Sequence, residues 1–181
     1  MWRAVDSIMP SLFFVFKKQA QSQLENIVQW CAGPMVHVDM IVSDRRLMFT
    51  SYMFERFSMN RPDGYSPETH TCLKIDVSQE AHDAALAMLL RFVGKQVPYN
   101  YADVFKLMVP SVAAPRDILD EEQIETLFCS QAVTVVLRHC LEDGNPLHPV
   151  IMNMNSRVTT PSMLYEAVAP FCQQTEEFFN I

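Results

Sequence analysis

Glycine is scarce in this sequence, with only four residues among 181. No Gly/Ser-rich linker, internal repeat or low-complexity segment divides the chain. Charged residues are also few, at 19% against 49% hydrophobic residues, so the chain can bury one sizeable core. These features predict a single domain.

Basic residues are too few and too dispersed to form a nucleic-acid surface. The net charge is −7, and the only adjacent Lys/Arg pairs are Lys17–Lys18 and Arg45–Arg46. A nucleic-acid interface needs clustered lysine and arginine. We therefore expect no nucleic-acid partner.

Metal-site and disulfide patterns are missing as well. The cysteines are odd in number, scattered and without a C-x-x-C pair, and the histidines other than His37 (His70, His82, His139 and His148) show no ligand spacing. These observations predict no metal, no cofactor and a reducing compartment, the cytoplasm.

A long hydrophobic run is absent too. Residues 8–16 are apolar but contain Pro10, are far shorter than the roughly 20 residues of a membrane span, and follow no basic segment typical of a signal peptide. This run could be a strand, a partner-binding segment or a membrane-surface contact. We favour packing against the domain or against a neighbouring protein.

Hydrophobic periodicity predicts several helices. Residues 19–31 have apolar side chains at helical spacing, which favours a helix with one face in the core, ended by Gly33-Pro34. Ser78 is a suitable N-cap for a helix that ends near Gly94. Residues 109–123 resemble a loop. Two further helices are expected, one from Cys129 to about residue 142 and one from Pro161 to about residue 169.

Alternating polarity predicts three strands. Residues 35–42 place His37, Asp39 and Ile41 on one side and apolar side chains on the other. Residues 47–54 follow a turn and favour a hairpin, and residues 72–77 favour a third strand. We expect an α+β fold in which these strands form an antiparallel sheet.

Cys129 and His37 are the residues best suited to chemistry. Cys129 stands at a predicted helix N-terminus, where backbone N–H groups stabilise a thiolate and a developing oxyanion. A core cysteine is the alternative, because cysteine is often buried. His37 lies in an apolar strand and is either a core histidine with satisfied hydrogen bonds or a general base.

Four blocks of residues 34–169 resemble the permuted NlpC/P60 papain-like proteins, including a bacterial amidase-like branch and proteins of large DNA viruses. The blocks are residues 37–42 (HVDMIV), 94–99 (GKQVPY), 128–131 (FCSQ) and 158–165 (VTTPSMLY). The resemblance implies an N-terminal extension and helix over residues 1–33, a papain-like domain over residues 34–170 and a tail over residues 171–181.

The resemblance also implies a mechanism. Cys129 would attack an amide, thioester or ester carbonyl, and His37, which precedes it in this permuted order, would activate it. Tyr99 matches a tyrosine near the nucleophile, and Ser130 and Gln131 follow the nucleophile as further substrate-binding candidates. Gln131 stands where relatives often have glutamate.

Several polar residues are candidates for orienting the His37 imidazole. The family's polar position falls on Phe49, which departs from the pattern. If Val42 pairs with Leu47, then Thr50 lies opposite Asp39 on the face of His37, and Tyr52 lies opposite His37. Thr50 is the first choice, with Asp39 and Tyr52 behind it; a one-residue slip would present Ser51 instead.

Three functions remain open from the sequence. The first is a cysteine hydrolase or acyltransferase, in the host cytoplasm if the protein is viral. The second is a viral structural or minor virion protein that keeps the fold while its Cys-His pair is idle. The third is a lipid-modifying enzyme that contacts a membrane through residues 8–16.

Overall fold

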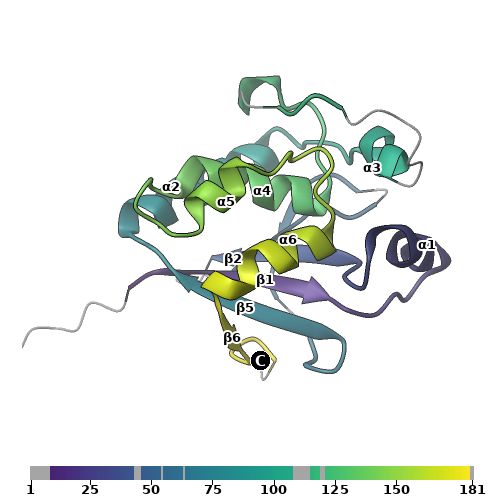
Figure 1. Cartoon of the computed structure of the whole chain (residues 1–181), viewed down its shortest axis with the longest axis horizontal. Helices are drawn as coiled ribbons and strands as arrows, with labels where there is room; N and C mark the ends of the chain where they lie inside the picture. Colours follow the sequence, from purple (N-terminus) through teal and green to yellow (C-terminus); the bar gives the residue numbers. More distant parts are fainter. Residues whose placement is uncertain are drawn as a thin grey trace, which may run out of the picture.

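The chain folds into an α+β arrangement in which helices cover an antiparallel sheet. The computed structural model describes residues 9–42, 46–53, 55–62, 64–107, 115–118 and 121–179. The sheet has six strands in the order β4-β3-β2-β1-β5-β6 (Figure 1). The strands are β1 (Ser11–Lys17), β2 (His37–Val42), β3 (Leu47–Thr50), β4 (Ser58–Asn60), β5 (His70–Asp76) and β6 (Gln173–Thr175).

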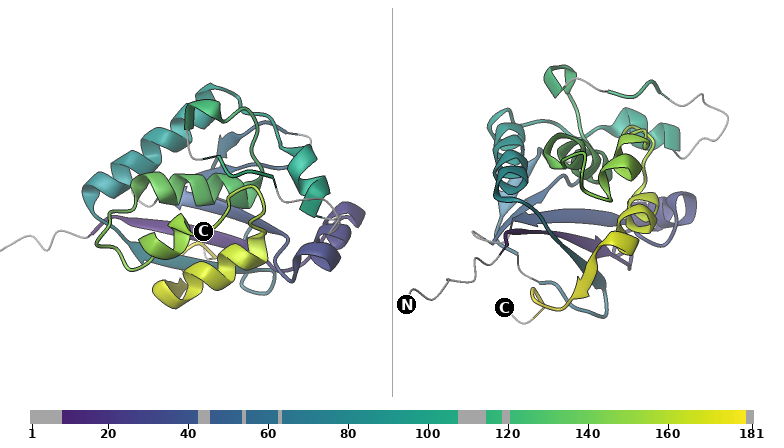
Figure 2. Two further views of the ribbon diagram at one scale, coloured as in Figure 1. Left: turned by 45° about the horizontal axis from the view of Figure 1, so that its top comes forward. Right: turned by 60° about the vertical axis from the view of Figure 1, so that its left-hand side comes forward.

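The helices form a layer over one face of the sheet and flank one end of it (Figure 2). They are α1 (Gln23–Ala32), α2 (Gln79–Gly94), α3 (Tyr101–Leu107), α4 (Cys129–Cys140), α5 (His148–Met152) and α6 (Pro161–Val168), with 3₁₀ turns at Glu121–Gln123 and Ala169–Phe171. None of the helices in the described ranges is long and apolar enough to cross a membrane.

The apolar run near the N-terminus is a central strand. Every residue of β1 is buried, and β1 pairs with both β2 and β5. The segment expected as an N-terminal extension therefore contributes to the middle of the sheet, and its apolar side chains are covered by the chain's own residues. The C-terminal segment likewise adds β6 at the sheet edge, beside β5.

The predicted hairpin register is confirmed. Val42 lies opposite Leu47, and Met40 lies opposite Phe49. Extending this pairing places Thr50 opposite Asp39. The predicted turn falls mostly on residues 43–45, which lie outside the described residues. The register fixes which side chains of β3 can reach His37.

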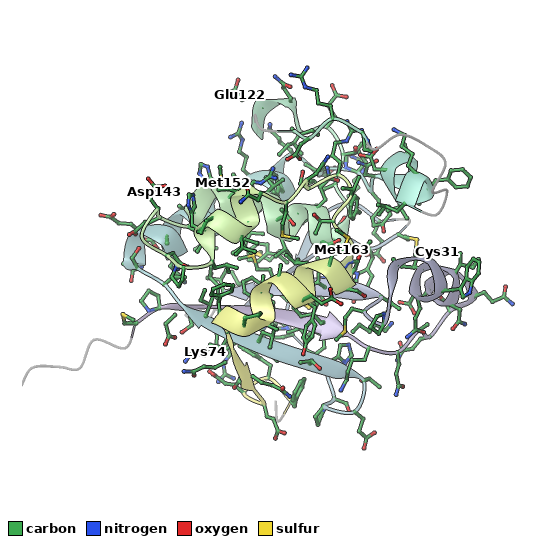
Figure 3. All side chains as sticks on the ribbon, in the orientation of Figure 1. Cys31, Lys74, Glu122, Asp143, Met152 and Met163 are labelled. Atoms are coloured by element: carbon green, nitrogen blue, oxygen red, sulfur yellow. The ribbon has the colours of Figure 1, made fainter. Side chains whose placement is uncertain are left out.

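Both faces of the sheet are buried, which explains how polar residues of β2 come to be enclosed. The main core lies between the sheet and the helices, where side chains fill the layer (Figure 3). A second, smaller cluster on the opposite face contains Phe13, Ile41 and Phe178. The rings of Phe13 and Phe178 meet edge to face at 4.6 Å. The face of β2 that carries His37 and Asp39 is therefore shielded from water along much of its length.

Several predicted helix boundaries agree with the structure. Ser78 caps α2 by accepting the N–H of Ala81, and Thr160 caps α6 by accepting the N–H of Met163. Gly94 is the last residue of α2 rather than its left-handed stop, because the positive φ of 51° falls on Gln96. The helices α3 and α5 were not expected from periodicity, since each is only about two turns long or shorter.

The expected core face of the first helix is wrong. Ile27 is 48% exposed and Trp30 is 88% exposed. α1 lies beside one end of the sheet instead of over its face, near α3 (Figures 1 and 2). Its described side chains Glu25, Val28 and Ala32 line a cavity.

Candidate active site

The fold brings the two predicted reactive residues together. Cys129 is the first residue of α4, and His37 is the first residue of β2, on which α4 packs. Both side chains are buried and both line the same cavity, and Cys129 contributes, after Asp39, to raising the pKa of His37 through charge and hydrogen bonding. Two residues that are 92 positions apart in the sequence thus line one cavity.

The start of α4 presents backbone donors beside the Cys129 sulfur. Phe128 is the N-cap, with extended backbone angles and no capping side chain. The first N–H groups of a helix have no partner within the helix, and they carry the positive end of its dipole. These groups can stabilise a thiolate and an oxyanion that forms on the carbonyl under attack.

Ser130 and Gln131 hold this helix start in place. The Ser130 hydroxyl donates to the Thr159 carbonyl at 2.7 Å. Gln131 Oε1 accepts the N–H of Phe128 at 3.4 Å and the amide of Asn100 at 3.3 Å. Both side chains are fully buried, and neither lines the cavity. Their predicted substrate-binding role is therefore replaced by a positioning role, because they face the protein interior.

His37 is oriented by two polar side chains on the same sheet face. His37 Nε2 lies 2.8 Å from Asp39 Oδ1 and 3.1 Å from Thr50 Oγ1. Because Nε2 is occupied in this way, Nδ1 is the ring nitrogen available to Cys129. The hairpin register made Thr50 the first choice and Asp39 an alternative, and both lie within hydrogen-bonding distance of His37.

The other residues considered for orienting His37 are Tyr52, Ser51 and Phe49, and their environments differ. The Tyr52 ring stacks on the His37 ring, with centroids 4.2 Å apart and an interplanar angle of 10°. Ser51 turns away and donates its hydroxyl to the Leu127 carbonyl at 3.1 Å. Phe49 is buried in the main core. Tyr52 therefore restrains the plane of the imidazole, whereas Ser51 and Phe49 do not contact it.

Electrostatics favour a charged His37 paired with an ionised Asp39. Burial alone would lower the pKa of His37, but the charges of Asp39 and Cys129 and hydrogen bonds to both raise it to about 10. Burial alone would raise the pKa of Asp39, but the His37 charge and hydrogen bonds from His37, Thr50 and Tyr65 hold it below its usual range. Both shifts have the sign expected of an ion pair.

Tyr65 was not found by sequence reasoning. Its hydroxyl donates to Asp39 Oδ2 at 2.8 Å and also contacts the Met48 sulfur. Tyr65 lies in the connection between β4 and β5, where neither helical nor strand periodicity marks a side chain as inward-facing. With this contact, each carboxylate oxygen of Asp39 has its own donor.

Tyr99 lines the same cavity as Cys129. Burial, with a further contribution from the neighbouring Cys129, raises the pKa of Tyr99, so its hydroxyl stays protonated. An isolated bridge pairs Tyr99 with Leu127, and the Asn100 N–H donates to the Leu127 carbonyl at 3.0 Å. These backbone contacts fix Tyr99 beside the segment that leads into α4.

A second buried ionic network braces α3 and the start of α4. Asp103, fully buried, accepts Arg157 Nε at 2.6 Å and Arg157 Nη2 at 2.8 Å. Asp103 Oδ2 also accepts the Asn100 amide at 2.8 Å, and Asn100 in turn reaches Gln131. This network links the helix that carries Cys129 to one wall of the cavity.

The cavity has a volume of about 330 Å³. It is enclosed by α1, by α3, by the start of α4 and by the segment after β3. Its lining residues are Ser22, Glu25, Val28, Ala32, Val36, His37, Tyr52, Met53, Tyr99, Val104, Leu107, Phe128, Cys129 and Pro161. Most of them are apolar. The wall from α1 was missed because the apolar face of that helix was expected in the core, and the wall from α3 was missed because this short helix carries a weak amphipathic signal.

Within the described ranges, no group of three or more His, Cys, Asp and Glu side chains is arranged to hold a metal ion. His37, the histidine in the site, instead has Cys129, Asp39 and Thr50 as partners. The arrangement of Cys129, His37 and Asp39 suits nucleophilic chemistry on an electrophilic carbon.

Comparison of the chain with protein-family models, with curated proteins and with solved structures found no match. Its function is therefore inferred from the geometry of the site and from the sequence resemblance.

Proposed function

We propose that this chain is a cysteine hydrolase or acyltransferase of the permuted NlpC/P60 papain-like type, acting on an amide, thioester or ester. The observation that carries the proposal is the connected set Cys129, His37 and Asp39 at the wall of a cavity. A thiol at a helix N-terminus, a base within hydrogen-bonding reach and a carboxylate on the far ring nitrogen form a nucleophilic triad.

The first half of the reaction transfers the acyl group to the enzyme. The Cys129 sulfur attacks the carbonyl carbon, a carbon–sulfur bond forms, and the bond to the leaving group breaks. The proton held by the His37 imidazolium passes to the leaving nitrogen, oxygen or sulfur. The product of this half is a thioester on Cys129 and a neutral His37.

The second half releases the acyl group. Neutral His37 takes a proton from water as the water oxygen attacks the thioester carbon, and the Cys129 sulfur leaves as a thiolate. An alcohol or amine in place of water gives acyl transfer instead of hydrolysis. Asp39 keeps the imidazole in one orientation through both halves, because Nε2 stays bound to its carboxylate.

The oxyanion that forms at the carbonyl would be stabilised by the first N–H groups of α4. The Tyr99 hydroxyl is a second donor at the same wall, because its raised pKa keeps it protonated. Ser130 and Gln131 contribute by fixing the helix start from which these donors project.

An acyl-enzyme should be trapped with an activated ester. Incubation with p-nitrophenyl acetate, followed by acid quenching and peptide mass spectrometry, is expected to place one acetyl group on Cys129. The half-buried Cys31 and Cys172 serve as internal controls for non-specific acetylation. Equal acetylation of all three cysteines, or acetylation that spares Cys129, would contradict the proposal.

A further inference from the structure

The cavity beside Cys129 has apolar walls on two sides. Val28 and Ala32 face it from α1, and Val104 and Leu107 face it from α3. Figures 1 and 2 show these two helices near each other at the same end of the sheet. Cys129 lines the same cavity as these side chains.

The polar side chains that line this cavity are already engaged. Glu25 is the one carboxylate among the lining residues, and its Oε1 lies 2.7 Å from Lys17 Nζ. Burial opposes ionisation of Glu25, but the Lys17 contact and a backbone N–H hold its pKa below the usual range. The Ser22 hydroxyl accepts the Glu25 N–H at 3.1 Å.

The two lining tyrosines also leave the cavity without an exposed charge. The Tyr52 ring is stacked on His37, and burial raises the pKa of Tyr52 and of Tyr99, so both hydroxyls stay neutral. A charged substrate group entering between α1 and α3 would find apolar walls and an already neutralised Glu25. Such a group would lose its hydration without gaining a partner.

We infer that the cavity holds the acyl part of the substrate and that this part is an uncharged hydrocarbon chain. This inference rests on the proposed function, because it takes the Cys129 thioester as the point where the chain is attached. A volume of about 330 Å³ gives room for a chain of several methylene groups beyond the carbonyl carbon. The leaving group then lies outside the space between α1 and α3.

The test is a chain-length series of p-nitrophenyl esters, from acetate through butyrate and hexanoate to octanoate. Each methylene that enters an apolar cavity is expected to raise kcat/KM by about fourfold until the cavity is full. Rates are divided by the hydroxide-catalysed rate of each ester, which removes differences in intrinsic reactivity. A monoester with a terminal carboxylate, p-nitrophenyl adipate, is expected to react at least about tenfold more slowly than the hexanoate.

Matched variants test whether the hydrocarbon chain of the substrate lies between α1 and α3. Val28→Phe narrows the cavity from α1, and its neighbour Ile27→Phe adds the same ring on the exposed face of that helix. Val28→Phe is expected to lower the octanoate-to-acetate ratio at least tenfold, whereas Ile27→Phe leaves the ratio unchanged. If Val28→Phe does not fold, Val104→Phe narrows the cavity from α3 and replaces it in the test. Its control is Phe105→Leu, which changes an exposed side chain of the same helix.

The outcomes separate this inference from the proposed function. Acetate turnover by Cys129 with no rise along the series, or with a preference for the adipate ester, would overturn the inference and leave the function standing. No turnover of any ester, together with no acetyl group on Cys129, would overturn both. A rise along the series that Val28→Phe removes and Ile27→Phe keeps would support both.

Discussion

Cys129→Ser should lower kcat/KM for p-nitrophenyl acetate by at least about 10³-fold while the protein remains folded. Serine is close to cysteine in size, so the free energy of unfolding should fall by no more than about 1 kcal/mol at this buried position. The hydroxyl ionises far less readily than the thiol, and an imidazole held by Asp39 for a thiolate partner would activate it poorly. Circular dichroism and thermal unfolding check the fold of the variant.

The matched control for this prediction is Cys172→Ser, which changes the same chemical group at a half-buried position away from the cavity. This variant should keep wild-type turnover. Turnover that survives Cys129→Ser would place the reactive group elsewhere. A wild-type protein without turnover, with Cys129→Ser equally folded, would favour the reading in which the pair is idle.

Asp39→Asn should lower turnover by about 10²- to 10⁴-fold. The carboxylate accepts the Nε2 proton of His37 at 2.8 Å, so it fixes the tautomer in which Nδ1 faces Cys129. An amide at this position can offer a donor to Nε2 and so favour the wrong tautomer, and it no longer stabilises the imidazolium. Steady-state kinetics across pH would measure the loss.

Thr50→Val is the control that separates the two partners of Nε2. Thr50 Oγ1 lies 3.1 Å from Nε2 and carries no charge, so its removal should lower turnover by about tenfold or less. A loss from Thr50→Val equal to or larger than that from Asp39→Asn would reverse the ranking. Thr50 would then be the main orienting residue, as the sequence alone suggested.

Asp39→Asn should also alter how the free energy of unfolding depends on pH. The pKa of His37 is raised from about 6.5 to about 10, so its ion pair stabilises the fold fully below about pH 6.5 and less as pH rises towards 10. The pKa of Asp39 is lowered, so its contribution is present above about pH 4 and is lost as pH falls through its folded value. Urea unfolding of the wild type should show a free energy of unfolding that declines between about pH 6.5 and about pH 10. The Asp39→Asn variant should lack this decline.

The hairpin register could be predicted because it depends on local rules, whereas the pairing of Cys129 with His37 came from the family resemblance. Strand alternation places His37 and Asp39 on one face, and pairing of Val42 with Leu47 brings Thr50 beside them. A cysteine directly after Phe128 at the start of an apolar helical pattern marks the helix N-terminus. Local patterns thus placed each residue on its element, and the resemblance paired them.

The central position of β1 could not be predicted from its own pattern. Every side chain of β1 is buried, so the strand lacks the alternation that marks a half-exposed strand. Its partners, β2 and β5, are set by tertiary packing rather than by a short turn. The same reason explains why residues 8–16 could be read as a partner-binding or membrane-contacting segment.

The walls of the cavity and the support for Asp39 were also beyond sequence reasoning. Tyr65 reaches Asp39 from a loop, and loop conformation leaves no periodic signal. The α1 pattern suggested a core face, yet α1 packs with only its inner edge and leaves Trp30 exposed. Contacts between short helices depend on long-range placement, which the fold supplies and the local sequence does not.

The pH dependence of Cys129 alkylation tests the central claim most directly. Iodoacetamide is applied from pH 5 to pH 9, and each cysteine is followed by peptide mass spectrometry. Free thiols react mainly near and above their ordinary pKa of about 8.5, and burial raises the pKa of Cys72 and of Cys140 to about 12, so those two should stay unmodified. At pH 6, Cys129 should react at least about tenfold faster than Cys31, and His37→Ala should remove this advantage. A Cys129 that reacts no faster than Cys31 at any pH, with or without His37, would contradict a thiolate–imidazolium pair.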